Sequence, residues 1–90
     1  MTRFDTSFLT RKQPGWYEGI DETGTGWRVV QETSSKWAVL KGGKGRIWVD
    51  DFEANSLGEA RLYVGGEVRE ATDPAYAARQ ARRRAARRVS

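Results

Sequence analysis

The chain has 90 residues and a formal net charge of +4, and it contains neither cysteine nor histidine. This length fits one small domain with at most a tail. The lack of cysteine excludes disulfides and thiolate zinc sites, and the lack of histidine removes the commonest general base and metal ligand. No apolar run approaches the roughly 20 residues of a membrane span. We therefore expect a cytoplasmic, non-enzymatic protein with no cofactor, no metal and no membrane contact.

The net charge hides an uneven distribution along the chain. The segment 79–88 holds six arginines, and no acidic residue follows Asp73. The rest of the chain carries ten basic and twelve acidic residues, which is a net charge of −2. Local positive charge of this kind indicates an anionic partner more strongly than a high isoelectric point does.

Residues 1–15 are predicted to form a flexible N-terminal arm. The arm contains a few apolar side chains that can dock on a core, but Pro14-Gly15 breaks the chain before the first expected strand. A small α+β domain is predicted over 16–70, followed by an arginine-rich helical tail over 73–90.

Four short apolar segments of the domain each contain one tryptophan. The tryptophans occupy positions 16, 27, 37 and 48, so they recur every ten to eleven residues. This spacing suits a strand plus a turn, and the intervening Gly, Asp, Ser and Thr residues supply turn chemistry. The pattern predicts an antiparallel meander of three or four strands. The expected strands are 16–20, 27–31, 37–40 and 46–49.

A capping box marks the start of the first helix. Ser56 is followed three residues later by Glu59, so the Ser56 hydroxyl can accept a hydrogen bond from the backbone N–H of Glu59. Leu57, Ala60 and Val64 then recur at helical spacing. We predict one short helix from Ser56 to Val64 that packs on the sheet.

The glycine pair that follows is interpreted as the stop of this helix. The stretch has a second interpretation, because Gly-Gly also suits a two-residue turn. Residues 61–70 would then form a tight hairpin and complete a small barrel. We prefer the helix, since the capping box precedes it and the apolar spacing fits.

The segment after the domain predicts a second helix. Asp73 suits the N-cap and Pro74 the first helical position, and the Ala- and Arg-rich sequence that follows has high helix propensity. Its small residues form a narrow stripe, and arginines cover most of the remaining circumference. The stripe consists of Ala78, Ala81, Ala85 and Val89. Because the arginines repel one another, we expect this helix to become firmer when an anion or a partner covers it.

The order of these segments resembles a known pattern. A meander containing GWRVV at 26–30 and WAVL at 37–40 precedes Phe52 and the helix sequence SLGEARLYV at 56–64. It is similar to small phage domains in which a three-stranded sheet packs on one helix, as in the integrase arm-binding and AP2-like families. In those families the free face of the sheet enters the DNA major groove. The resemblance implies DNA contacts by Arg28, Lys36, Lys41, Lys44 and Arg46.

The arginine-rich segment is the strongest functional feature of the sequence. Guanidinium groups can pair with phosphate oxygens through two hydrogen bonds each, and binding releases counterions. The predicted contacts are Arg79, Arg82, Arg83, Arg84, Arg87 and Arg88. An acidic protein surface and a plain solvated tail are the other interpretations of the same segment.

The loop KGGKGR at 41–46 is a weaker candidate. Its glycines let backbone N–H groups approach an anion, but it lacks the spacing of a nucleotide-binding loop, so a hairpin turn is the simpler interpretation. Its cations, Lys41, Lys44 and Arg46, are still predicted to touch phosphate. The tryptophans are interpreted as core residues, with one or two exposed at an interface.

These features predict a small accessory protein that binds DNA or RNA through the phosphate backbone. The alternative is a phage-type effector or inhibitor that binds a host protein through exposed tryptophans and mixed-charge surfaces. Salt separates the two hypotheses, because phosphate binding weakens steeply as salt rises and an interface anchored by tryptophan does not.

Overall fold

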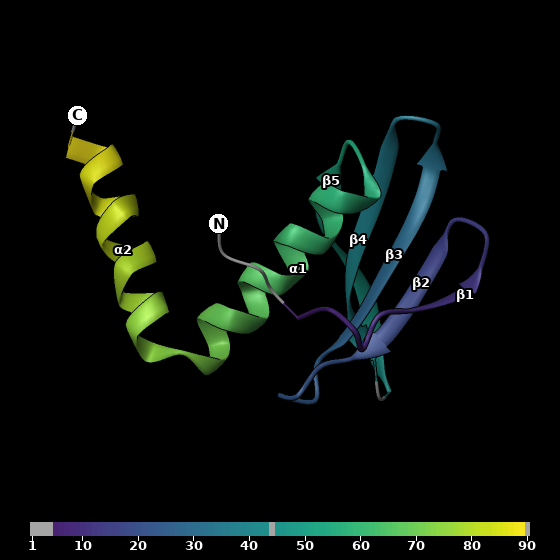
Figure 1. The fold of residues 1–90 in the computed structure, drawn as a ribbon, viewed down its shortest axis with the longest axis horizontal. Coiled ribbons are helices and arrows are strands. Elements are labelled where there is room, and N and C mark those ends of the chain that lie inside the picture. The colour runs from purple at the N-terminus through teal and green to yellow at the C-terminus, as the bar shows by residue number, and fades with distance from the viewer. Residues whose placement is uncertain (1–4, 44, 90) are drawn as a thin grey trace.

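The strands lie in the sheet in the same order as in the chain, so the sheet is a five-stranded antiparallel meander (Figure 1). This is a computed structural model that describes residues 5–43 and 45–89, with the side chains of 88 and 89 outside the description. The strands are β1 (Thr10–Gln13), β2 (Trp16–Ile20), β3 (Gly26–Thr33), β4 (Lys36–Gly43) and β5 (Arg46–Ala54). The helices are α1 (Leu57–Thr72) and α2 (Pro74–Val89). The α+β class and the antiparallel meander are therefore confirmed.

The core lies between one face of the sheet and α1. The register aligns Tyr17, Val29, Val39 and Phe52 across β2 to β5, so these side chains share one face. Val29 and Val39 are completely buried, and Trp27 on the same face is 1% exposed. From α1, a stripe at four-residue spacing covers this face. The stripe consists of Ala60, Val64 and Val68.

The start of α1 follows the capping box, but its end does not follow the glycine pair. Ser56 is the N-cap, and its Oγ accepts a hydrogen bond from the Glu59 backbone N–H at 3.1 Å. The helix continues through Gly65 and Gly66 to Thr72, so both the predicted stop at Val64 and the hairpin over 61–70 are wrong.

The helix runs through two glycines despite their low helix propensity. Gly65 is buried. A Cβ added at Gly66 would lie 3.7 Å from the hydroxyl oxygen of Tyr76, an ordinary van der Waals contact. The buried residues Val64 and Val68 flank the pair, so packing of α1 on the sheet outweighs the local preference of the glycines.

The described part of the N-terminal segment, from residue 5, belongs to the fold, where the sequence predicted a flexible arm over 1–15; residues 1–4 of that prediction lie outside the described residues. Thr10–Gln13 pair with β2 as an edge strand, which raises the number of strands to five. Leu9 is buried in the core, and the hydroxyl of Thr6 accepts a hydrogen bond from Arg61 on α1 at 3.2 Å. Gly19 permits this crossing, because a side chain there would collide with the carbonyl of Phe8.

A buried carboxylate holds the turn between β2 and β3. Asp21 accepts hydrogen bonds from the backbone N–H groups of Thr23 and Thr25 at 2.8 and 3.1 Å and from the indole N–H of Trp27 at 2.8 Å. Burial raises the pKa of Asp21, but the bonds from Thr23, Trp27 and Thr25 outweigh burial and leave that pKa below its usual value. Asp21 thereby links the backbone of the turn to Trp27, the most buried tryptophan.

Candidate nucleic-acid interface

A single residue joins the two helices. The backbone N–H of Asp73 donates to the carbonyl of Arg69 at 2.8 Å and so closes α1. The Asp73 Oδ1 accepts from the backbone N–H groups of Ala75 and Tyr76 at 3.1 and 3.2 Å and so begins α2, as the N-cap pattern predicted. The bond from Tyr76 is the main reason that the pKa of Asp73 lies below its usual value, and Arg69 and Arg79 lower it further.

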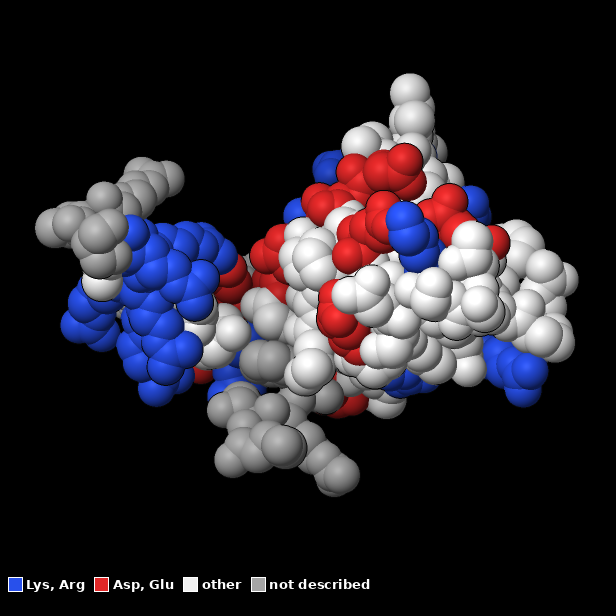
Figure 2. Space-filling model, turned by 90° about the horizontal axis from the view of Figure 1, so that it is seen from above, with Lys and Arg blue, Asp and Glu red and all other residues white. Residues whose placement is uncertain are grey.

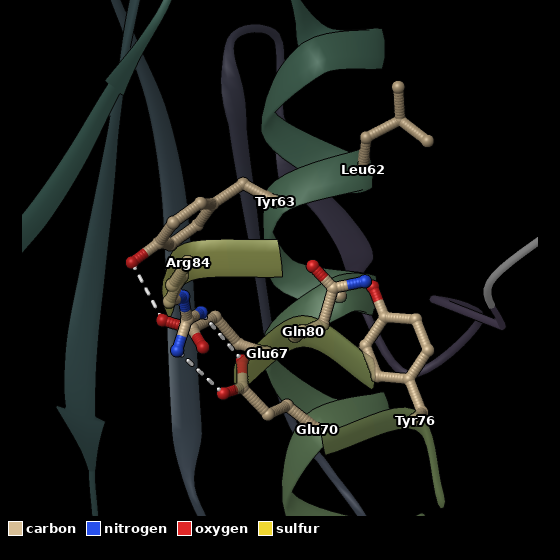
Figure 3. Close-up of a pocket in the computed structure, with 8 residues that line it drawn as sticks. Leu62, Tyr63, Glu67, Glu70, Tyr76, Gln80 and Arg84 are labelled. Carbon is tan, nitrogen blue, oxygen red and sulfur yellow. Dashed lines mark hydrogen bonds and ion pairs between the residues drawn. The ribbon is translucent and has the colours of Figure 1, made fainter. Parts of the chain in front are cut away.

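The helix α2 leans on α1 through a polar junction. Figure 3 shows Tyr76, Gln80 and Arg84 of α2 facing Tyr63, Glu67 and Glu70 of α1 across a small cleft of about 210 Å³. The guanidinium of Arg84 reaches across and donates to both carboxylate oxygens of Glu70, at 3.0 and 3.1 Å. This two-point pair raises the pKa of Arg84. One of the predicted phosphate contacts is therefore already paired with an acid of the protein.

A phenol closes the other end of this junction. The hydroxyl oxygen of Tyr63 lies 2.7 Å from Asp51 Oδ2 and 2.8 Å from Glu67 Oε1. Burial, and then these two carboxylates, raise the pKa of Tyr63. The phenol therefore stays protonated at neutral pH and links β5 to α1. Its ring also stacks on Phe52, with centroids 4.2 Å apart.

The arginines of α2 are exposed around a helix that projects from the sheet. Figure 2 shows Lys and Arg gathered over α2 at one end of the molecule, whereas Asp and Glu gather over the middle of this face, among uncharged residues. The exposed cations are Arg79, Arg82, Arg83, Arg84 and Arg87. The sixth predicted contact, Arg88, belongs to α2, but its side chain lies outside the described part of the chain.

The stripe of small residues on α2 is exposed where the structure describes its side chains. Ala78, Ala81 and Ala85 all face solvent. The half-buried side of the helix is formed instead by Tyr76, Ala77 and Gln80. Tyr76 therefore packs against α1 and is not part of the sheet core.

The two described cations of the predicted loop at 41–46, Lys41 and Arg46, lie apart from α2. Lys41 is exposed, and its ammonium stands 5.4 Å from the ring centroid of the core residue Trp27. Arg46 is exposed at the start of β5, and Lys44 lies outside the described residues. Figure 1 places the sheet and α2 on opposite sides of α1. Lys41 and Arg46 therefore do not form one continuous basic surface with α2.

The sheet face opposite α1 holds an arginine between two tryptophans. The guanidinium of Arg28 lies 4.3 Å from the ring centroid of Trp48 and 5.2 Å from that of Trp16. Its Nε donates to Glu18 Oε1 at 2.6 Å, and the indole N–H of Trp16 donates to the same oxygen at 3.3 Å. Arg28, a DNA contact by resemblance, is thus engaged within the protein.

A second cation implied by the resemblance is also paired. The ammonium of Lys36 lies 3.1 Å from Glu53 Oε1 in an exposed pair between β4 and β5.

The arrangement around Arg28 was missed from sequence, because it depends on strand register. The only available signal was the alternation of Trp16 and Glu18 toward one face of a strand.

Comparison with known proteins adds no relative. No family model, curated protein or solved structure matches the chain. Among the described helices, none is both long and apolar enough to cross a membrane. The arginines of α2 present guanidinium groups. Each has five N–H donors in a fork that fits phosphate oxygens.

Proposed function

We propose that this protein is a small, non-enzymatic nucleic-acid-binding accessory protein that uses α2 to contact phosphate. One observation carries the proposal: five arginines are exposed on a helix that projects from the sheet and contains no acidic residue. Charge of one sign on a projecting helix attracts a polyanion from several directions. A cytoplasmic location, expected from the sequence, belongs to the same proposal.

The expected binding mode is electrostatic. Because Arg84 is paired with Glu70, about four arginines can each neutralise one phosphate of duplex DNA, so log K should fall with log salt at a slope of about −3.6. Such contacts fix the position of the helix on the backbone and carry no sequence information. The sheet cations Lys41 and Arg46 would add a second, separate contact region, since the sheet that carries them lies on the other side of α1 from α2 (Figure 1).

A salt titration tests this proposal. Binding of a fluorescent 20-base-pair duplex is followed by anisotropy between about 20 and 200 mM salt, the range over which phosphate contacts weaken most visibly. The variant Arg82→Gln/Arg83→Gln should lower the slope by about two, because each lost phosphate contact removes about one unit. The control Arg11→Gln/Lys36→Gln removes the same charge from exposed positions of the sheet and should leave the slope nearly unchanged.

Two results would contradict the proposal. Absence of binding at the lowest salt would reject a nucleic-acid partner. Equal loss in both variants would show that net charge, and not α2, governs binding.

The protein-binding alternative has the support of one observation. Trp16 and Trp48 are half-exposed on the sheet face opposite α1, and the arginine between them is held by Glu18. A face whose aromatic residues reach solvent and whose central charge is paired suits an apolar partner surface. This alternative predicts a partner whose binding changes little over the same salt range and is lost in Trp48→Ala.

A further inference from the structure

The largest hollow among those described lies on the sheet, away from α2. Its volume is about 430 Å³, within the usual range for small-ligand pockets, and its lining comes from all five strands and from Phe8. The cleft between the two helices has half this volume and is crossed by the Arg84–Glu70 pair. No residue of α2 lines the sheet pocket, so the phosphate contacts proposed for α2 do not account for it.

Two glycines line part of this pocket with backbone alone. A Cβ at Gly26 would approach the carbonyl oxygen of Gly42 to 2.7 Å. Gly43 has φ of 87°, and a Cβ there would lie 3.1 Å from the Cα of Gly26. Both contacts are with the facing strand, so these glycines let β3 and β4 lie close together and leave only backbone atoms at this part of the pocket wall.

The walls of the pocket include two aromatic side chains and one aliphatic side chain. Trp48 lines one side, and Ile20, which is 48% exposed, and Phe8 also line the pocket. The Arg28 guanidinium lies over the Trp48 ring, 4.3 Å from its centroid, which fixes the indole in place. A planar heterocycle gains stacking and apolar contact from such walls.

Two charged groups give the pocket its polarity. Glu18 lines it, and the bonds from Arg28 and Trp16 both engage Oε1 of this carboxylate, so Oε2 keeps lone pairs for another donor. Lys12 is exposed and also lines the pocket. The pocket therefore offers an acceptor for N–H groups, a stacking surface and a cation for an anionic group.

We propose that this pocket binds an unpaired guanine base, with its 5′-phosphate toward Lys12. Guanine carries adjacent N–H donors on its Watson–Crick edge, which suit a carboxylate, whereas adenine places a ring acceptor there. The proposal extends the nucleic-acid function proposed for α2 by adding a single-strand contact with base preference. A free guanine nucleotide and an unpaired guanine in a strand share this chemistry.

NMR on the ¹⁵N-labelled full chain tests the inference. The probes are guanosine, adenosine and cytidine 5′-monophosphates at millimolar concentration, ribose 5-phosphate, and single-stranded hexamers with and without guanine. Guanosine 5′-monophosphate should shift the Trp48 indole signal and the amides of Gly26 and Gly43. The adenosine nucleotide should bind at least about fivefold more weakly, since one good pair of hydrogen bonds to a base edge discriminates on that scale. Ribose 5-phosphate should leave the indole unchanged.

A matched pair of variants locates the site. Ile20→Trp fills the pocket and should abolish the guanosine-dependent shifts. Leu62→Trp places the same side chain at a position on α1 that is 59% exposed, and it should leave them intact. Stronger binding of the guanine-containing hexamer than of the mononucleotide indicates a strand as the occupant, and the reverse indicates the free nucleotide.

Three results would overturn the inference. They are no shift at the pocket with any nucleotide, equal binding of the guanosine and adenosine nucleotides, and full binding by Ile20→Trp. Shifts confined to α2 would also reject the pocket while leaving the proposed function intact. Conversely, pocket shifts in a wild-type chain that binds no duplex at the lowest salt would reject the α2 proposal alone.

Discussion

Arginine side chains have opposite surroundings in the two parts of the molecule, the sheet with α1 and the projecting helix α2. On the sheet, Arg28 lies between two tryptophans and pairs with Glu18, so its charge serves packing. On α2, Arg82 and Arg83 are exposed on a helix that has no acidic residue. The comparison teaches that the number of arginines says little about binding until the local partners of each are known.

The largest expected effect would come from breaking the sheet unit at its centre. Trp27→Ala removes the largest fully buried side chain and its bond to Asp21, so we expect a loss of about 4 kcal/mol in the free energy of unfolding. Urea unfolding measures it. Tyr76→Ala, made in the other region, should leave the unfolding of the sheet unit nearly unchanged and should alter only the α2 junction. Similar losses in both variants would show that the two regions unfold as one.

A smaller loss is expected at the buried carboxylate. Asp21→Asn keeps the shape but weakens bonds from the Thr23 and Thr25 backbone and from Trp27, so we expect about 2 kcal/mol of destabilisation. The pH dependence gives a second measurement. Because the pKa of Asp21 is lowered by folding, its contribution is complete above the unfolded value near 4 and is lost as pH falls through the folded value. The variant should therefore show a flatter loss of stability in acid.

A milder change tests the start of α1. Ser56→Ala removes the acceptor for the Glu59 backbone N–H and should cost about 1 kcal/mol, measured by urea unfolding. Ser56→Asp restores a capping oxygen and serves as the control. If alanine and aspartate variants have equal stability, the capping bond contributes nothing measurable.

The smallest expected effect comes from turning one paired arginine, Arg84, into an unpaired one. Glu70→Gln removes the carboxylate that binds Arg84, so the guanidinium becomes available to phosphate. An exposed pair contributes little to stability, so unfolding should change by less than about 0.5 kcal/mol. Duplex affinity at low salt should rise about threefold, because one more cation can reach the backbone. Unchanged affinity, measured by anisotropy, would mean that Arg84 stays outside the interface.

The parts of the fold that were predictable are those set by local chemistry. The tryptophan-bearing strands, the Ser56 cap and the Asp73 cap all follow from turn and capping residues. The strand β1 was missed because its residues are all exposed and carry no apolar alternation. The length of α1 was missed because Gly65-Gly66 is a stop signal in the local pattern, whereas the burial of Val64 and Val68 on either side, which carries the helix on, is a tertiary effect.

The candidate sites divide in the same way. The arginines of α2 are visible in the sequence as a charge run. The pairing of Arg84 with Glu70 depends on how the two helices meet, and the sheet pocket depends on residues of five strands that only register brings together. Long-range geometry, and not residue type, decides both.

The joint at Asp73 has a mechanical consequence for the tip of α2. A helix of 16 residues is about 24 Å long, so a rotation of about 10° at its base displaces the far end by about 4 Å. Arg79 lies near the base of α2 and Arg87 near its tip. Between them, the Arg84–Glu70 pair links α2 to α1 and restrains this rotation. If α2 binds phosphate as proposed, its base would set where the ligand is held, and its tip could follow the curvature of that ligand.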